Sequence, residues 1–207
     1  MTEINFLIPD YYSKFTCIAD RCPITCCQEW KIGVDADTNR KWKKLQAPET
    51  VPKQKKNLSA YTIKKDGQRV IGLDSDHRCP FLNSEKLCCL VVAYGDKVLS
   101  ETCTTFPREE HRFPTHNEKM LMPCCPAVID LWNKQKSLHF PNVSDTLSDT
   151  GDTDTSVLFL LREKLLNLLD DSSRTIEEEL LESFYILQEL YQHQPLTKEL
   201  LEDYFSD

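Results

Sequence analysis

The sequence predicts an α+β protein, in which a cysteine-rich, metal-organised region with a small β-hairpin is followed by an α-helical extension. All ten cysteines lie between Cys17 and Cys125. Residues 1–139 hold 21 basic and 17 acidic side chains (net +4), whereas residues 140–207 hold 4 and 16 (net −12), which together give −8. Only residues beyond 155 show a sustained helical apolar period. We therefore expect a metal-binding region at 1–139, an acidic linker at 140–155 and helices at 156–207.

The cysteine-rich region is expected to combine one hairpin with short helices. Apolar residues alternate over 30–34, as they do in a half-buried strand. Asp35 or Asp37 would then cap a helix. The pair Asp66-Gly67 lies between two apolar stretches and is the strongest β-hairpin signal in the chain. Residues 79–108 are dense in possible metal ligands, and we expect short helices and turns there.

The extension is expected to form three amphipathic helices. Ser173 or Thr175, followed by a glutamate-rich turn, would begin the second helix, and Pro195 separates it from the third. Apolar stripes of this kind usually build a core rather than a cofactor site. The three stripes are Leu158, Leu161, Leu165, Leu168 and Leu169; Ile176, Leu180, Phe184, Leu187 and Tyr191; and Leu200, Leu201, Tyr204 and Phe205.

Composition and charge argue against several classes of protein. No apolar run approaches the roughly 18 residues of a membrane span, and the N-terminus lacks the basic start and long apolar stretch of a signal peptide. We therefore expect a cytoplasmic protein with no membrane partner. No nucleic-acid partner is expected, because the extension is acidic and the basic residues from Lys53 to Arg69 include no stacking aromatic beyond Tyr61.

The cysteines predict a metal site rather than disulfides. Cytosolic thiols stay reduced, and three pairs are adjacent in sequence, at 26–27, 88–89 and 124–125. Neighbouring Cα atoms are about 3.8 Å apart, too close for an unstrained bridge, so each pair would need two partners. Thiolates in a reducing cell select zinc or iron–sulfur clusters. The sequence has no C-x2-C knuckle of the zinc-ribbon kind, which favours a cluster, and ten thiols would suffice for two four-thiolate sites.

Histidines are weaker ligand candidates than the cysteines. His77 lies two residues before Cys79 and is kept as a minor candidate. His111 and His116 are expected to be ordinary surface residues, because Pro114 breaks any regular helix between them.

A series of motifs runs from about residue 5 to residue 130. It comprises Phe6-Leu-Ile-Pro-x-Tyr11, Phe15-x-Cys17-x4-Cys22-x3-Cys26-Cys27-x2-Trp30, Cys79-Pro-Phe-Leu82, Leu87-Cys88, Cys103-x2-Phe106-Pro-Arg108 and Cys125-Pro126. This series resembles the flagellin lysine-N-methylase (FliB) family, which is related to a wider class described as a zinc- or iron-chelating domain. The cysteines on the family pattern are the expected metal ligands, and Cys89 and Cys124 are extras. The ligands are Cys17, Cys22, Cys26, Cys27, Cys79, Cys88, Cys103 and Cys125.

The resemblance implies a methyltransferase that moves a methyl group from S-adenosylmethionine to lysine amines of flagellin. It also implies an associated iron–sulfur cluster, 4Fe-4S in the first instance with zinc as the alternative, in a cytosolic bacterial protein. Family members are usually longer, so this chain is expected to be shortened at its C-terminal end. No glycine-rich loop marks the cofactor pocket, but Arg108 is a candidate to bind the carboxylate of S-adenosylmethionine.

Two further functions stay open at this point: a non-catalytic zinc- or iron-binding module, and a cluster-based redox protein. Methyl transfer requires a neutral lysine amine, whose pKa is ordinarily about 10.4, and therefore desolvation or a nearby base. Glu29, Asp35 and Tyr94 are candidate helpers, with a solvated or capping role as the alternative. Trp30 would either cover the cluster or belong to the core.

Overall fold

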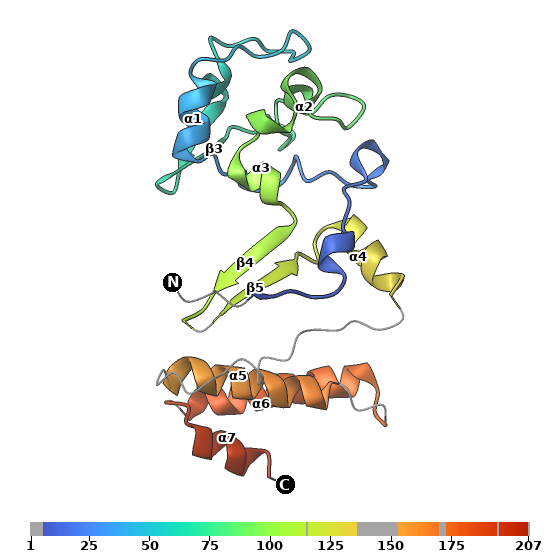
Figure 1. The fold of residues 1–207 in the computed structure, drawn as a ribbon, viewed down its shortest axis with the longest axis vertical. Coiled ribbons are helices and arrows are strands. Elements are labelled where there is room, and N and C mark those ends of the chain that lie inside the picture. The colour runs from blue at the N-terminus through green and yellow to red at the C-terminus, as the bar shows by residue number, and fades with distance from the viewer. Residues whose placement is uncertain (1–5, 115, 136–152, 170–172, 194, 207) are drawn as a thin grey trace. The chain divides into compact units, whose positions relative to one another are not determined.

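The computed structural model describes residues 6–114, 116–135, 153–169, 173–193 and 195–206. Small sheets and short helices are followed by longer helices, which confirms the predicted α+β class (Figure 1). The chain divides into two compact units. We call Ile8–His111 with Glu118–Phe140 the cysteine unit, and Met1–Leu7, Arg112–Asn117 and Pro141–Asp207 the helical unit. The predicted linker lies outside the described residues up to position 152, and its last three residues begin a helix, because that helix starts at Thr153.

Helix α1 (Ala36–Trp42) begins at one of the two predicted caps. The Asp35 carboxylate accepts a hydrogen bond from the N–H of Thr38 at 2.7 Å, which satisfies a donor of the first turn. The helix follows two short 3-10 turns, η1 (Tyr12–Lys14) and η2 (Ala19–Arg21). It ends at Trp42, whose buried ring donates Nε1–H to the carbonyl of Val98 at 2.7 Å.

The predicted hairpin is confirmed. After η3 (Leu58–Tyr61), strands β2 (Thr62–Lys65) and β3 (Gln68–Ile71) pair antiparallel, with Lys65 opposite Gln68. Asp66 and Gly67 both have positive φ, 51° and 76°, as a two-residue type I′ turn requires. The strand predicted at 30–34 is reduced to one bridge from Gly33 to Val70. Helix α1 starts directly after its cap, so the segment has no room for a longer ladder.

Aromatic residues from distant segments form one core of the cysteine unit. The ring of Phe81 packs edge-on against Trp42, with centroids 5.8 Å apart, and against Tyr61 at 4.9 Å. Each such side chain contributes roughly 1.5–3 kcal/mol when it is fully buried. Cys79 and Cys89 belong to the same buried cluster, so this core extends to the cysteines.

The segment 79–108 has the short helices that its sequence predicts. They are α2 (Cys89–Tyr94), η4 (Asp96–Val98) and α3 (Glu101–Thr105). Gly95, with φ of 74°, makes the sharp turn between the first two.

Strands β4 (Arg108–Arg112) and β5 (Asn117–Leu121) form a three-stranded sheet with β1 (Phe6–Leu7), in the order β1-β5-β4. Helix α4 (Pro126–Asn133) follows, with Pro126 in its first turn, where a missing N–H costs nothing. Its residue Val128 is buried in a second core cluster with Tyr11 and Phe15.

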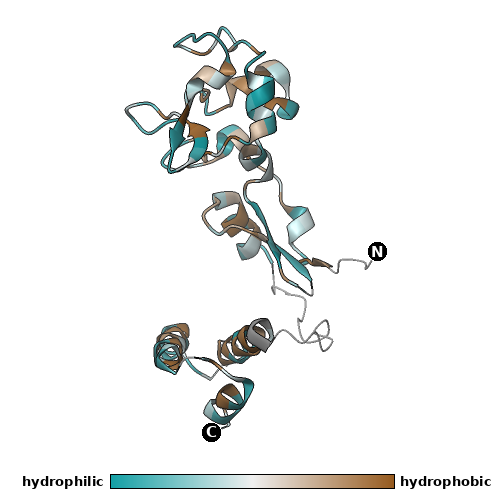
Figure 2. Cartoon of the chain, turned by 90° about the vertical axis from the view of Figure 1, so that its left-hand side faces the viewer, coloured by the Kyte–Doolittle hydropathy of each residue, from teal (hydrophilic) through white to brown (hydrophobic). Residues whose placement is uncertain are grey.

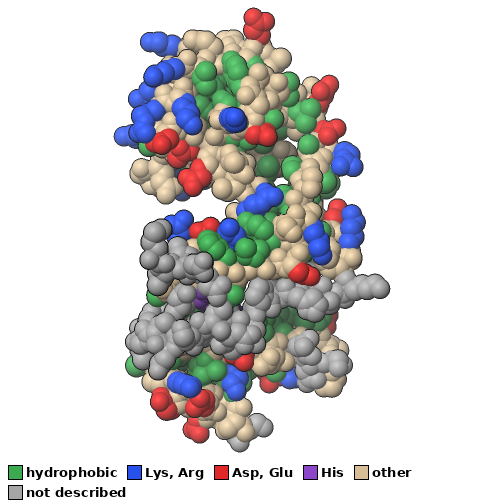
Figure 3. All heavy atoms as spheres, viewed as in Figure 1, with side chains coloured by type: hydrophobic (Ala, Val, Ile, Leu, Met, Phe, Trp, Pro, Cys, Tyr) green, Lys and Arg blue, Asp and Glu red, His purple; other side chains and the backbone are tan. Residues whose placement is uncertain are grey.

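Lysine and arginine side chains gather over α1 and the β2–β3 hairpin (Figures 1 and 3). Tyr61, the one aromatic residue of the predicted basic stretch, is only 1% exposed, and Lys55 lies over its ring at 4.9 Å. Tyr61 therefore offers no exposed ring for base stacking. The exposed lysines of this basic surface include Lys41, Lys43, Lys44, Lys53, Lys55, Lys56, Lys64 and Lys65.

The helical unit contains α5 (Thr153–Leu168), α6 (Ile176–Gln192) and α7 (Lys198–Tyr204). Helix α6 begins at the predicted Thr175 with a complete capping box, in which Thr175 and Glu178 satisfy each other's backbone N–H groups. The three helices bury a common cluster that includes Leu161, Leu190 and Leu201. No helix in the described part of the chain is both long enough and apolar enough to cross a membrane.

The prediction of which apolar residues of α6 face the core is wrong. Ile186 and Leu190 face the core instead, together with Glu179 and Ser183. Apolar residues cover a wide arc of this helix, so their period alone could not show which part of the arc packs against the core. Figure 2 shows both hydrophobic and hydrophilic residues around the helices. The predicted stripe is exposed: Ile176 by 53%, Leu180 by 54%, Phe184 by 64%, Leu187 by 45% and Tyr191 by 77%.

Candidate metal centre

Backbone hydrogen bonds join the first cysteine loop to the segment of Cys79. The N–H of Cys79 donates to the carbonyl of Cys27 at 2.7 Å, and the N–H of Glu29 donates to the carbonyl of His77 at 3.0 Å. Cysteines that are far apart in sequence are thus held side by side by the protein backbone.

Two further cysteines are placed by short helices. Cys88 is the N-cap of α2. The backbone N–H of the next residue, Cys89, donates to the carbonyl of Phe81 at 2.8 Å. Cys103 lies in α3, and its N–H contacts the Ser100 hydroxyl at 3.4 Å.

Five cysteines form what we call the inner thiol group: Cys26, Cys27, Cys79, Cys88 and Cys103. Burial raises the pKa of the Cys79 thiol to about 12; the N–H of Phe81 opposes this, and the thiols of Cys88, Cys103 and Cys26 add to it. Burial also raises the pKa of Cys88 and of Cys103, and the Cys26 thiol adds to both of these increases. The pKa of Cys26 is raised first by its hydrogen bond with Cys27. Four of these sulfurs therefore all lie within electrostatic range of one another.

Three other cysteines form a separate set, which we call the outer thiol group: Cys17, Cys22 and Cys125. Burial is the main cause that raises the pKa of Cys125, and the thiols of Cys22 and Cys17 add to it. The Cys17 sulfur accepts a hydrogen bond from the N–H of Ala19 at 3.4 Å. The structure thus divides the eight predicted ligands into five and three.

The two extra cysteines lie outside the motif pattern, although the Cys89 thiol also adds to the pKa of Cys88. Cys89 is 3% exposed and belongs to the aromatic core, whereas Cys124 is exposed at the surface. Each is adjacent to a predicted ligand, Cys88 or Cys125, which makes the two pairs suitable for matched substitutions.

The donor chemistry of the inner group suits a soft metal. Clustered, desolvated thiols hold their protons tightly, and a bound cation reverses this because it stabilises the thiolate. Within the described ranges, no three or more Cys, His, Asp or Glu side chains already stand in the geometry of a bound ion. The assignment of individual ligands therefore stays a prediction.

Arg108, the predicted binder of the cofactor carboxylate, lies at the start of β4. Its guanidinium carbon is 5.0 Å from the centre of the Phe15 ring and 5.9 Å from that of Tyr12. These contacts fix the side chain by cation–π attraction, and its role toward the cofactor stays a prediction.

The candidate helper residues have structural partners. Asp35 caps α1 and also accepts a hydrogen bond from the N–H of Glu101 at 3.0 Å. Tyr94 donates its hydroxyl to the carbonyl of Gln46 at 3.1 Å. Glu29 faces His77 across 3.9 Å at the exposed surface.

Trp30 lies beside the inner thiol group. Its Nε1–H donates to the carbonyl of Cys26 at 2.6 Å, and its ring packs against Phe106 with centroids 5.3 Å apart and planes at 45°. It is partly buried and packs against the same core cluster as Cys27 and Cys103. Trp30 therefore both belongs to the core and fixes the backbone of a candidate ligand.

The expectation that His116 is a surface residue is wrong. Its side chain is 1% exposed and packs between Phe113 at 5.0 Å and Phe159 at 5.1 Å, within the helical unit. Phe159 comes from a distant helix, and no local pattern could have indicated that contact.

Two residues that position the inner thiols were missed from the sequence. A Cβ at Gly33 would come within 2.9 Å of the Thr102 hydroxyl, so the glycine lets α3 approach. Ser100 is completely buried and caps α3. A serine three residues before Cys103 is an ordinary helix-start signal and could have been found.

Comparison with known proteins identifies relatives. The chain is 30% identical over 174 residues to the lysine-N-methylases of Salmonella typhimurium and of Salmonella choleraesuis, covering 81% of this chain and 42% of each relative. It is 28% identical over 139 residues to the flagellar biosynthetic protein FliU of Salmonella muenchen, covering 62% of this chain and 76% of that protein. The chain thus spans less than half the length of the lysine-N-methylases that it matches.

No family model and no solved structure matches the chain. The relatives and the cysteine motifs agree on one assignment. The chain belongs to the lysine-N-methylase (FliB) family.

Proposed function

We propose that this chain takes part in lysine N-methylation of flagellin, with S-adenosylmethionine as the methyl donor and an iron–sulfur cluster bound by the inner thiol group. The relatives' names support methyl transfer to lysine and a flagellar setting. The observation that supports the metal part is the mutual electrostatic interaction of the thiols of Cys26, Cys79, Cys88 and Cys103. Four thiolates are the ligand set of a 4Fe-4S cluster.

The reaction is a displacement at a methyl carbon. The lone pair of the lysine amine forms the N–C bond, while the C–S bond breaks and its electrons pass to sulfur, which leaves as a neutral thioether. The amine has to lose its proton before the attack, because the ammonium has no lone pair. Reaction in the cytoplasm, before flagellin is exported, would provide both substrates.

The outer thiol group would hold a separate metal ion. Cys17, Cys22 and Cys125 offer three sulfurs, which leaves one position of a tetrahedral ion to another ligand. The four cluster thiolates and these three account for seven of the eight predicted ligands without Cys89 or Cys124, and the eighth, Cys27, is hydrogen-bonded to Cys26.

Two measurements test this proposal. Anaerobically purified protein is analysed for iron, sulfide and zinc; a colourless protein with stoichiometric zinc and no sulfide would overturn the cluster. The chain is then incubated with S-adenosylmethionine and flagellin, and methylated lysines are sought by mass spectrometry. Methylation should be lost in Cys103→Ser and retained in Cys89→Ala. Unmodified flagellin in the presence of an intact cluster would overturn the enzymatic role of this chain.

A further inference from the structure

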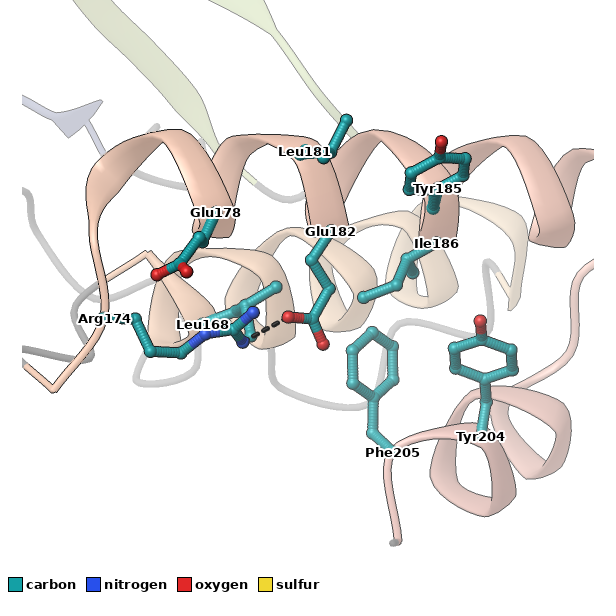
Figure 4. Close-up of a pocket in the computed structure, with 9 residues that line it drawn as sticks. All are labelled: Leu168, Arg174, Glu178, Leu181, Glu182, Tyr185, Ile186, Tyr204 and Phe205. Atoms are coloured by element: carbon teal, nitrogen blue, oxygen red, sulfur yellow. Dashed lines mark ion pairs between the residues drawn. The ribbon is translucent and has the colours of Figure 1, made fainter.

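The helical unit contains a hollow of about 520 Å³ between α5, α6 and α7 (Figure 4). Its size lies in the range of small-ligand pockets, roughly 300–1,000 Å³. It is remote from every cysteine in sequence, and the proposed metal sites make no use of it. The lining residues that matter here are Arg174, Glu178, Glu182, Ile186, Tyr204 and Phe205.

Aromatic rings form one side of this hollow. Tyr204 and Phe205 are half-buried, with ring centroids 5.5 Å apart and planes at 66°. The Tyr204 hydroxyl donates to Glu189 at 2.7 Å, which fixes the orientation of the ring. In Figure 4 the ring of Phe205 lies between Glu182 above it and Tyr204 beside it. Ring faces attract cations, and most strongly cations that are weakly hydrated.

Carboxylates outnumber cations among the lining residues. Arg174 forms an ion pair with Glu182. Glu178 accepts a hydrogen bond from the N–H of Thr175 at 3.0 Å, and this bond lowers the pKa of its carboxyl, so Glu178 is ionised at neutral pH. One negative charge therefore remains beside an apolar floor that includes Ile186.

We propose that this hollow binds an alkylated onium cation, either the sulfonium of the methyl donor or the methylated ammonium of a lysine product. The identity of these two sources rests on the proposed function, whereas the binding of an onium group rests on the hollow itself. A primary ammonium loses strong hydrogen bonds to water when it enters among rings, and an alkylated cation loses far less. The hollow should therefore prefer trimethyl-lysine to lysine.

The direct test uses choline as the probe and 3,3-dimethylbutan-1-ol, its uncharged carbon isostere, as the matched control. Both are titrated into the full chain and followed by NMR. Because the two probes share size and shape, we expect choline to bind about fivefold or more tightly through its charge alone. Equal affinities, or no binding of choline at millimolar concentration, would overturn the proposal. Parallel titrations with S-adenosylmethionine and with Nε-trimethyl-lysine then decide between the two sources.

Variants locate the binding. Phe205→Leu keeps the apolar volume and should weaken choline about fivefold, and Glu182→Gln should also weaken it. Arg174→Gln should strengthen binding, because it removes the internal cation that competes for Glu182. Tyr191→Leu, on α6 but outside the hollow and 77% exposed, is the control and should change nothing. Circular dichroism checks that the helices persist; an equal effect of Phe205→Leu and Tyr191→Leu would contradict the proposed site.

These titrations need no turnover. Choline binding without flagellin methylation would support the onium site and overturn only the proposed function. Methylation without choline binding would support the proposed function and overturn only the onium site.

Discussion

The N–H of Cys79 donates a hydrogen bond to the carbonyl of Cys27 at 2.7 Å. This bond joins two segments that each carry part of the inner thiol group. The protein backbone therefore holds these two cysteine segments next to each other.

Cys88 and Cys89 are adjacent but have different surroundings. Cys88→Ser should remove most of the bound iron, because it takes one of the four thiols that interact electrostatically and are proposed to bind the cluster. Cys89→Ala should leave metal content unchanged, because Cys89 lies outside the cysteine pattern of the family motifs. Iron and sulfide per chain measure this, and equal loss in both variants would contradict the assignment.

The outer thiol group should behave as a separate site. Cys125→Ser and Cys17→Ser should remove the same fraction of total metal, and Cys103→Ser a different fraction, since the two groups do not share sulfurs. Cys124→Ser is the adjacent, exposed control. Loss of all metal in every one of these variants would instead indicate a single site.

Removal of metal should loosen the cysteine unit more than the helices. Thiolate sites couple metal binding to folding, whereas α5, α6 and α7 bury their own cluster around Leu190 and Leu201. After treatment with a chelator, most helical circular dichroism should remain, and proteolysis should cut residues 8–111 first. The prediction fails if the two units are cut at equal rates.

Asp35 should matter far more to stability than its neighbour Asp37. Its carboxylate caps α1 through Thr38 and also binds the N–H of Glu101, so Asp35→Ala should cost about 1–2 kcal/mol of unfolding free energy. Asp37 is exposed and pairs only locally with Arg40, so Asp37→Ala should cost at most about 0.5 kcal/mol. Urea unfolding measures both, and similar costs would argue against the Asp35 contacts.

The same aspartate gives a pH dependence with a definite sign. Burial alone would raise the pKa of Asp35, but the N–H groups of Thr38 and Glu101 outweigh it and lower that pKa to about 2. The unfolded value is about 3.9, so this contribution is complete above about pH 5 and is lost as pH falls toward 2. Unfolding free energy measured over this range should fall more steeply in the native chain than in Asp35→Asn.

Much of the cysteine unit follows from local sequence. The Asp66-Gly67 hairpin, the Asp35 cap and the short helices after Cys79 were predictable, because turn and cap residues act on their immediate neighbours. The buried His116 and the exposed stripe of α6 were not, because burial depends on partners contributed by distant segments.

The sequence by itself determined the α+β class, the family motifs and the identity of the eight candidate ligand cysteines. Only the tertiary structure divided those cysteines into groups of five and three, and only it brought Arg174, Glu182 and Phe205 around one hollow. Motif spacing records which residue types are available. Which of them meet is decided by long-range packing and backbone pairing, such as the bond between Cys27 and Cys79, and these contacts leave no periodic trace in the chain.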